Sequence, residues 1–338
     1  MSRKRRGIGR VTQATVAQLA GVSSMTVSRY FNQPERVNEE HRARIAAAVA
    51  QTGYVPNLAA GGLASARGRI VAMVVPNISG PIFAPTLQAF SAALEAEGYQ
   101  VLLASSYFDE QKEEHAVRAF LGWAPAALVL TSRFHSAATE SMLAAAQVPL
   151  VETWDYCPER APVQVGFSHR AVGEQGAAYL HARGYRRATF VLNSATGDHS
   201  ALERCEGFCQ AFEALGGQAG RYVPGVELAP FDAGKAALLA LMQASSPPQA
   251  VFFANDNLAA GGLLAAARAG ISVPGQCAIL GFGDYPFAQM LLPSLSSIRP
   301  PAQAIGEQAA RWVLEEIAGR ASGQPARLEC EVVGRESA

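Results

Sequence analysis

Apolar residues near the N-terminus recur at the spacing of short helices. One set predicts a helical face that ends where Gly21 supplies a turn, and the next predicts a second helix that begins at a serine cap. The residues concerned are Val16, Ala17, Leu19 and Ala20 in the first helix, Ser23 or Ser24 at the cap, and Val27 and Phe31 in the second helix. This pattern indicates a helix-turn-helix between Thr12 and Asn32.

Two helices of this length need a third to pack against, because isolated short helices are marginal in water. Residues 39–52 predict that third helix, with Asn38 as its cap and Ile45, Ala46 and Val49 at the spacing of a buried face. The second helix then presents to solvent the side chains of Ser24, Met25, Ser28 and Arg29. Such side chains fit the edges of bases in a major groove, although an ordinary three-helix packing unit has the same spacing.

The charge of the chain is unevenly distributed. Residues 1–67 hold ten Lys or Arg against three Glu, a net charge of +7, whereas the remainder holds 18 basic and 25 acidic residues, a net charge of −7. A cationic head gains affinity for phosphate by releasing counterions, and an acidic body is kept away from the duplex. The opening Ser-Arg-Lys-Arg-Arg is typical both of a disordered DNA-binding arm and of a solubilising tail.

From residue 69 onward, short apolar runs alternate with Ala-rich helical stretches, in two successive series. The runs are 70–75, 101–104, 126–130 and 150–152, then 188–192, 249–254 and 277–281, and the helical stretches lie near 84–97, 111–121, 138–146, 169–183, 202–215 and 257–268. Apolar strands connected by helices predict parallel sheets, and two series predict two doubly wound lobes. A cleft between such lobes, at the carboxyl ends of the strands, is a usual place for a small ligand.

Several classes of protein have little support. No G-x-G-x-x-G or Walker loop follows the first strand, and no cofactor or metal is expected, since Cys205 and Cys209, four residues apart, have no His or Cys partner at zinc spacing. The five cysteines are scattered, unlike a disulfide framework. With no apolar run of membrane-spanning length and no signal peptide, we expect a cytoplasmic, nucleoid-associated protein.

Specific motifs make the chain similar to the LacI/GalR family of bacterial transcription regulators. They are Val-Ala-x-Leu-Ala-Gly-Val-Ser-x-x-Thr-Val-Ser-Arg at 16–29, Tyr-x-Pro-Asn at 54–57, Ala-Asn-Asp-Asn-Leu-Ala at 254–259, Gly-Ile-Ser-Val-Pro at 270–274 and Gly-Phe-Gly-Asp at 281–284. The middle region most resembles the gluconate-operon repressors, through Leu-Gly-Trp at 121–123, Leu-Thr-Ser-Arg-Phe-His at 130–135 and Val-Gly-Phe-Ser at 165–168.

The resemblance implies three parts. They are an all-α helix-turn-helix domain over 1–56, a hinge over 57–68, and a two-lobed α/β domain like a periplasmic binding protein over 69–338, with two doubly wound parallel sheets. Family members bind a pseudo-palindromic operator as homodimers. The tail after a helix at 302–318 has no leucine heptads, so we expect no tetramer-forming coiled coil.

The resemblance also implies which residues bind DNA. Ser24, Met25 and Arg29 match base-reading positions, and Arg29 is the strongest candidate because a guanidinium can bond a guanine edge with two donors. The other DNA-binding candidates are Thr12, Ser23, Thr26, Ser28, Asn32, Tyr54, Asn57, Ala60 and Leu63. In the family a leucine at the position of Leu63 is inserted between central base pairs and bends the duplex. Gly61 and Gly62 depart from the family hinge and cost a helix about 2 kcal/mol relative to Ala.

The candidates for effector binding follow strands or lie on loops facing the inferred cleft. They are Phe83, Tyr107, Arg133, Trp154, Arg204, Asn255, Asp256 and Asp284. By resemblance, Arg204 and Asp256 match positions that bond sugar hydroxyls. Gly283 stands where relatives often have Asp, so the neighbouring Asp284 is the expected substitute.

Arg133 is the residue that favours an anionic ligand, because a guanidinium can grip a carboxylate with two charge-assisted bonds and His135 lies nearby. An ion pair between Arg133 and a neighbouring Glu or Asp is the other interpretation. The expected protein is a repressor of a sugar-acid operon, released from its operator when gluconate or a related aldonate closes the cleft.

Other functions share some of these features. A ligand-dependent activator or a corepressor-type regulator that responds to a neutral sugar or nucleobase would have the same motifs. A hydrolase built on Ser168 with His169, or on Asp198 with His199, is disfavoured because adjacent residues do not orient one another and no nucleophile elbow is present. A periplasmic sugar-binding protein is disfavoured by the helix-turn-helix.

Overall fold

The computed structural model describes residues 11–56, 68–159, 162–193, 197–225, 228–320 and 324–338. The chain divides between Gly68 and Arg69 into two compact units, which are described separately. No helix among the described residues is long and apolar enough to cross a membrane.

The N-terminal unit is a three-helix domain. It contains α1 (Gln13–Ala20), α2 (Ser24–Asn32), the short 3-10 helix η1 (Pro34–Arg36) and α3 (Glu39–Thr52). Side-chain oxygens of Thr12, Ser23 and Asn38 cap the three α-helices, and Gly21 ends α1 with a left-handed φ of 62°. The buried core consists of Val16, Ala17, Ala20, Val27, Val37, Ile45 and Ala48.

Three residues expected in this core are exposed. Leu19 is 52% exposed and Phe31 36%, and Ala46 also faces solvent. Val16, Ala17 and Ala20 already span the arc of α1 that meets the other helices, and Leu19 falls outside that arc because each residue turns the helix by about 100°. Similarly, α3 packs through Ile45 and Ala48, one turn apart, which leaves Ala46 on the solvent side. The partly exposed Phe31 ring lies 6.0 Å from the ring of Tyr54.

The second unit contains two six-stranded sheets, one in each lobe. The sheet of the first lobe has the order β11-β5-β4-β3-β1-β2, and all its neighbouring strands are parallel. Its elements are β1 (Ile70–Val75), α5 (Ala84–Ala96), β2 (Gln100–Ser105), α6 (Glu110–Leu121), β3 (Ala127–Thr131), α7 (Ala137–Ala146), β4 (Leu150–Thr153), β5 (Val163–Gly166), α12 (Ala302–Ile317) and β11 (Ala326–Arg327).

Alternation along β1 shows how this sheet is covered on both faces. Val71 and Met73 belong to the cluster that includes apolar residues of α5 and α12, whereas Ala72 and Val74 belong to the cluster formed with α6 and α7. Helices on both faces explain why the strand is continuously apolar.

The sheet of the second lobe has the order β12-β10-β9-β8-β6-β7, and only β12 is antiparallel to its neighbour. Its elements are α8 (His169–Ala182), β6 (Arg187–Val191), α9 (His199–Ala214), β7 (Gln218–Tyr222), α10 (Pro230–Met242), β8 (Ala250–Phe253), α11 (Asp256–Ala269), β9 (Ala278–Phe282), the short η2 (Ala288–Met290), β10 (Ser296–Arg299) and β12 (Glu331–Val333).

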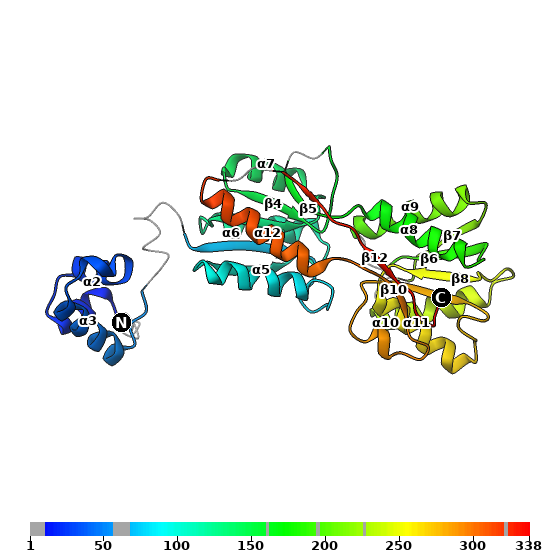
Figure 1. Cartoon of the computed structure of the whole chain (residues 1–338), viewed down its shortest axis with the longest axis horizontal. Coiled ribbons are helices and arrows are strands. Elements are labelled where there is room, and N and C mark those ends of the chain that lie inside the picture. Colours follow the sequence, from blue (N-terminus) through cyan, green and yellow to red (C-terminus); the bar gives the residue numbers. More distant parts are fainter. Residues whose placement is uncertain (1–10, 57–67, 160–161, 194–196, 226–227, 321–323) are drawn as a thin grey trace, which may run out of the picture. The chain divides into compact units, whose positions relative to one another are not determined.

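The chain passes between the lobes three times: after β5, after β10 and between β11 and β12. Figure 1 shows α12 returning to the first lobe, and the red C-terminal segment running from one lobe to the other. Two doubly wound lobes of largely parallel strands are thereby confirmed.

Two helices of the second lobe, α8 and α9, pack closely against each other. A Cβ at Gly173 of α8 would collide with the carbonyl of Arg204 in α9, and one at Gly207 would collide with the backbone of Arg170. These two glycines let α8 and α9 approach closely, which places Arg204 beside His169.

Candidate functional site

The outer face of α2 carries the residues expected to read bases. Ser24, Met25 and Arg29 are exposed, Met25 by 65%. Among the described residues Arg29 makes no ion pair, so its guanidinium is available to a ligand outside the domain.

The expected phosphate-binding residues lie at helix ends or along α2. Ser23 accepts a hydrogen bond from the Thr26 backbone N–H at 3.1 Å, and the Asn32 amide donates to the Ser28 carbonyl at 3.0 Å. Thr12 accepts from the Thr15 backbone N–H at 3.3 Å, and Tyr54 is half-buried against the core. Asn57, Ala60 and Leu63 lie outside the described residues, as do Gly61 and Gly62.

A cavity of about 330 Å³ lies between the two lobes of the second unit. Five of the eight candidates for ligand binding line it: Phe83, Tyr107, Trp154, Arg204 and Asn255. Tyr107, Trp154 and the lining residue Ser132 have left-handed φ angles of 55°, 66° and 95°. Such conformations cost about 1–3 kcal/mol each and often occur in functional sites.

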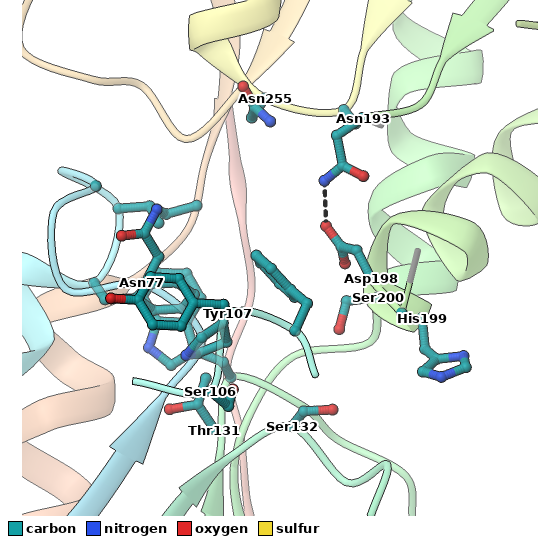
Figure 2. Close-up of a pocket in the computed structure, with 18 of the residues that line it drawn as sticks. Asn77, Ser106, Tyr107, Thr131, Ser132, Asn193, Asp198, His199, Ser200 and Asn255 are labelled. Atoms are coloured by element: carbon teal, nitrogen blue, oxygen red, sulfur yellow. Dashed lines mark hydrogen bonds between the residues drawn. The ribbon is translucent and has the colours of Figure 1, made fainter. Parts of the chain in front are cut away.

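Polar side chains of both lobes surround this cavity, as Figure 2 shows. The first lobe contributes Asn77, Ser106, Thr131 and Ser132, and the second contributes Asn193, Asp198, His199 and Ser200. Sequence reasoning did not identify these residues as ligand-binding, although most lie at or just after the ends of parallel strands, where ligands bind in such sheets. From sequence, Asp198 and His199 are candidates only for a catalytic pair.

Arg204 brings a positive charge to the lining. It is 5% exposed, its Nη1 lies 2.9 Å from His169 Nδ1, its Nη2 donates to the Ala254 carbonyl at 3.3 Å, and its Cζ lies 4.3 Å from the centre of the Phe282 ring. Burial and the charge of Arg204 hold the pKa of His169 well below its usual value, so the imidazole is neutral. Within the described chain, Arg204 makes no salt bridge and its buried Nε has no hydrogen-bond partner.

Four carboxylates line the cavity, those of Asp109, Glu110, Glu113 and Asp198, and none of them forms a salt bridge with Arg204 in the described chain. Asp198 caps α9 through the Ala201 backbone N–H at 2.9 Å and accepts from the Asn193 amide at 2.7 Å. Asp109 caps α6 through two backbone N–H groups. A buried guanidinium without a bound carboxylate suits a ligand that supplies an anion.

Arg133 does not line the cavity, which corrects the expectation from sequence. Its guanidinium bonds Asp155 of the first lobe at 3.2 Å and Glu203 of α9 in the second lobe. It also lies over the Phe134 ring at 4.2 Å. The ion-pair interpretation therefore applies, and the pair joins the two lobes. Burial raises the pKa of Asp155 to about 7, although Arg133 opposes that shift.

We expect Arg133→Gln to weaken ligand binding without changing ligand preference. Losing an ion pair between the lobes should make closure of the cleft less favourable by roughly 1–3 kcal/mol. This range lies between the values typical of exposed ion pairs and of buried ones. Calorimetry with an acidic and a neutral sugar measures both affinities, and Arg118→Gln, in an exposed pair within α6, is the control. If Arg133→Gln weakened binding of the acidic sugar alone, the result would show that Arg133 contacts the acid group of the ligand.

Asp256 and Asp284 also lie outside the lining, and each is held by neighbouring groups. Asp256 is fully buried and accepts from Ser297 Oγ and the Tyr285 backbone N–H, both at 2.7 Å. Burial raises its pKa to about 7. Asp284 pairs with Arg299 and Arg335, each at 2.6 Å. Asp256 therefore positions the backbone of Tyr285, which lines the cavity, while Asp284 links Arg299 of β10 to Arg335, which follows β12.

The described residues contain no group of three His, Cys, Asp or Glu side chains that could hold a metal ion. The serine and aspartate of the candidate hydrolytic pairs have structural roles, since Ser168 caps α8 and Asp198 caps α9. Local geometry therefore gives no support for a hydrolase.

A helix-turn-helix with an open reading face and a two-lobed body with a ligand-sized cavity define a ligand-responsive DNA-binding protein. Residues 13–57 match the bacterial regulatory proteins of the lacI family, and residues 177–338 match a periplasmic binding protein-like domain. The chain belongs to the LacI family and is a DNA-binding transcriptional regulator, not an enzyme.

Individual relatives cover nearly the whole chain. It is 38% identical to the HTH-type transcriptional regulator GntR of Pseudomonas aeruginosa, over 98% of this chain and 97% of the relative. Identity to the regulator GntR of Escherichia coli K12 is 31%, over 90% and 91%. A LacI family transcriptional regulator from Silicibacter pomeroyi superimposes with a TM-score of 0.89 at 31% identity, over 97% of this chain and 99% of that one.

Proposed function

We propose that this regulator represses a sugar-acid catabolic operon and is released from its operator by gluconate or a related aldonate. The observation that carries the proposal is the Arg204 guanidinium, buried in the cavity lining without a carboxylate among the described residues. A ligand carboxylate would form an ion pair with this guanidinium, because leaving a buried charge unpaired is costly.

The rest of the lining fits a polyhydroxylated chain. Amides and hydroxyls such as Asn77, Asn193 and Ser132 offer both donors and acceptors, and the Phe83 and Trp154 rings, 4.9 Å apart, offer an apolar wall. The chemistry of the guanidinium group made Arg133 the expected partner of the acid group, and this proposal assigns that role to Arg204 instead.

The proposed mechanism links the cavity to the operator. Residues 1–56 read DNA, residues 57–68 form the hinge, and residues 69–338 bind effector and dimerise. Ligand closure between the lobes would separate the paired hinges of a homodimer acting in the cytoplasm, so ligand and operator would weaken each other's binding by reciprocal linkage.

The test is a titration of the full chain on its operator with gluconate and with glucitol, its neutral counterpart. We expect gluconate to release the operator and to stabilise the free protein by about 2.7 kcal/mol at 100 times its dissociation constant, with a much smaller effect of glucitol. Equal effects of the two ligands would contradict the sugar-acid assignment. Tighter operator binding with gluconate would show a corepressor response.

A further inference from the structure

Glu113 is a buried carboxylate in the cavity lining, and the proposed mechanism gives it no role. It lies on α6 of the first lobe and is 6% exposed. The neighbouring acids differ from Glu113 in position or partner. Asp109 caps the helix, Glu110 lines the cavity but is exposed and lies 3.8 Å from His199 Nε2, and Glu114 bonds Arg118 at 2.6 Å outside the cavity.

A buried histidine fixes one oxygen of Glu113. His135 Nδ1 lies 2.7 Å from Glu113 Oε1, and His135 Nε2 lies 3.5 Å from Glu152 Oε1 on β4. Burial alone would lower the pKa of His135, but Glu113 and Glu152 together raise it to about 9. The imidazolium therefore lies between two carboxylates, and its Nδ1 holds one oxygen of Glu113 at the wall of the cavity.

The second oxygen of Glu113 has no hydrogen-bond partner among the described residues, and the side chain borders the cavity. Arg204 borders the same cavity from the other lobe. The second lobe also adds Asp198 to the lining, but the Asn193 amide and the Ala201 backbone N–H bind that carboxylate. Arg204 and Glu113 therefore remain as opposite charges presented by the two lobes to one ligand. A molecule with a single carboxylate would bind in one direction, with its acid at Arg204 and a hydroxyl at Glu113.

We propose that Glu113 determines effector specificity by accepting a hydrogen bond from the ligand hydroxyl remote from the acid group and by excluding a second carboxylate there. This inference rests on the proposed sugar-acid function. Gluconate and glucarate allow a direct comparison, because they differ only in the replacement of a terminal hydroxymethyl group by a carboxylate. A fixed anion rejects the diacid through repulsion and desolvation, whereas a neutral site would not.

The experiment is calorimetry of the full chain with gluconate and with glucarate. The wild-type protein should bind gluconate at least tenfold more tightly. Glu113→Gln, which keeps the shape and can still accept from His135, should weaken gluconate and strengthen glucarate, so that the ratio of affinities falls at least tenfold. Glu114→Gln, one residue along the same helix, should leave the ratio unchanged.

The possible results distinguish failure of the Glu113 inference from failure of the proposed sugar-acid function. If the wild-type protein binds gluconate and Glu113→Gln leaves the ratio intact, the specificity role is wrong while the sugar-acid proposal stands. Binding of neither acid by the wild-type protein overturns both. Should Glu113→Gln not fold, Glu113→Asp retains the charge and should still exclude glucarate; tight glucarate binding by that variant would overturn the inference.

Discussion

Replacing Arg204 with glutamine should lower the affinity of the regulator for gluconate at least about 100-fold, or about 2.8 kcal/mol. The reason is that the guanidinium is buried in the cavity and lacks a carboxylate among the described residues, so a bound acid group would be its main counter-charge. Calorimetry of the full chain measures the loss, and release of operator by gluconate should fail in parallel.

Because Arg204 also bonds His169 and the Ala254 carbonyl, the variant needs a check on folding. The thermal midpoint without ligand reports any structural loss. Arg204→Lys keeps the charge but not the fork of donors, and we expect it to lose less affinity than Arg204→Gln. Gluconate binding that survives intact in a folded Arg204→Gln protein would exclude the proposed contact.

Arg29→Ala should lose about 1–3 kcal/mol of binding free energy on the operator and much less on a scrambled duplex. Its exposed side chain on α2 makes no ion pair within the described part of the chain. Titration of both duplexes at one salt concentration separates base reading from phosphate attraction, since the latter does not depend on sequence.

Arg42→Ala is a suitable control, because Arg42 is an exposed cation of the same unit on α3, paired with Glu39 at 3.7 Å. It removes the same charge from a different helix and should not discriminate between the duplexes. Equal losses on operator and scrambled DNA for Arg29→Ala would make Arg29 a phosphate contact.

Elements with strong local patterns were predictable. The helices of the N-terminal unit follow from caps at Ser23 and Asn38, and the buried strands follow from apolar runs such as Ile70–Val75. Edge and short elements were missed. For example, β7 (Gln218–Tyr222) has no fully buried residue, so its pattern is weak. The helix α10 was also missed.

The cavity shows a different limit. That polar residues after parallel strands converge on one cleft follows from topology, and Tyr107, Trp154 and Asn255 were located in this way. The sequence predicted both Arg133 and Arg204 at the cleft, and only Arg204 borders it. Which guanidinium lacks a carboxylate partner did not follow from the sequence, because the partners of Arg133 come from distant segments.

Local order in the sequence therefore determined the helix-turn-helix, the exposed face of its second helix and the succession of strands and helices, since periodicity and capping act over a few residues. Only the tertiary structure decided the roles of the charged groups. Arg133 is bound by Glu203, 70 residues away, and Asp256 by Ser297, 41 residues away, whereas Arg204 has no such partner in the described chain. A charge is available to a ligand only when no opposite charge lies within bonding distance, and the fold sets those distances.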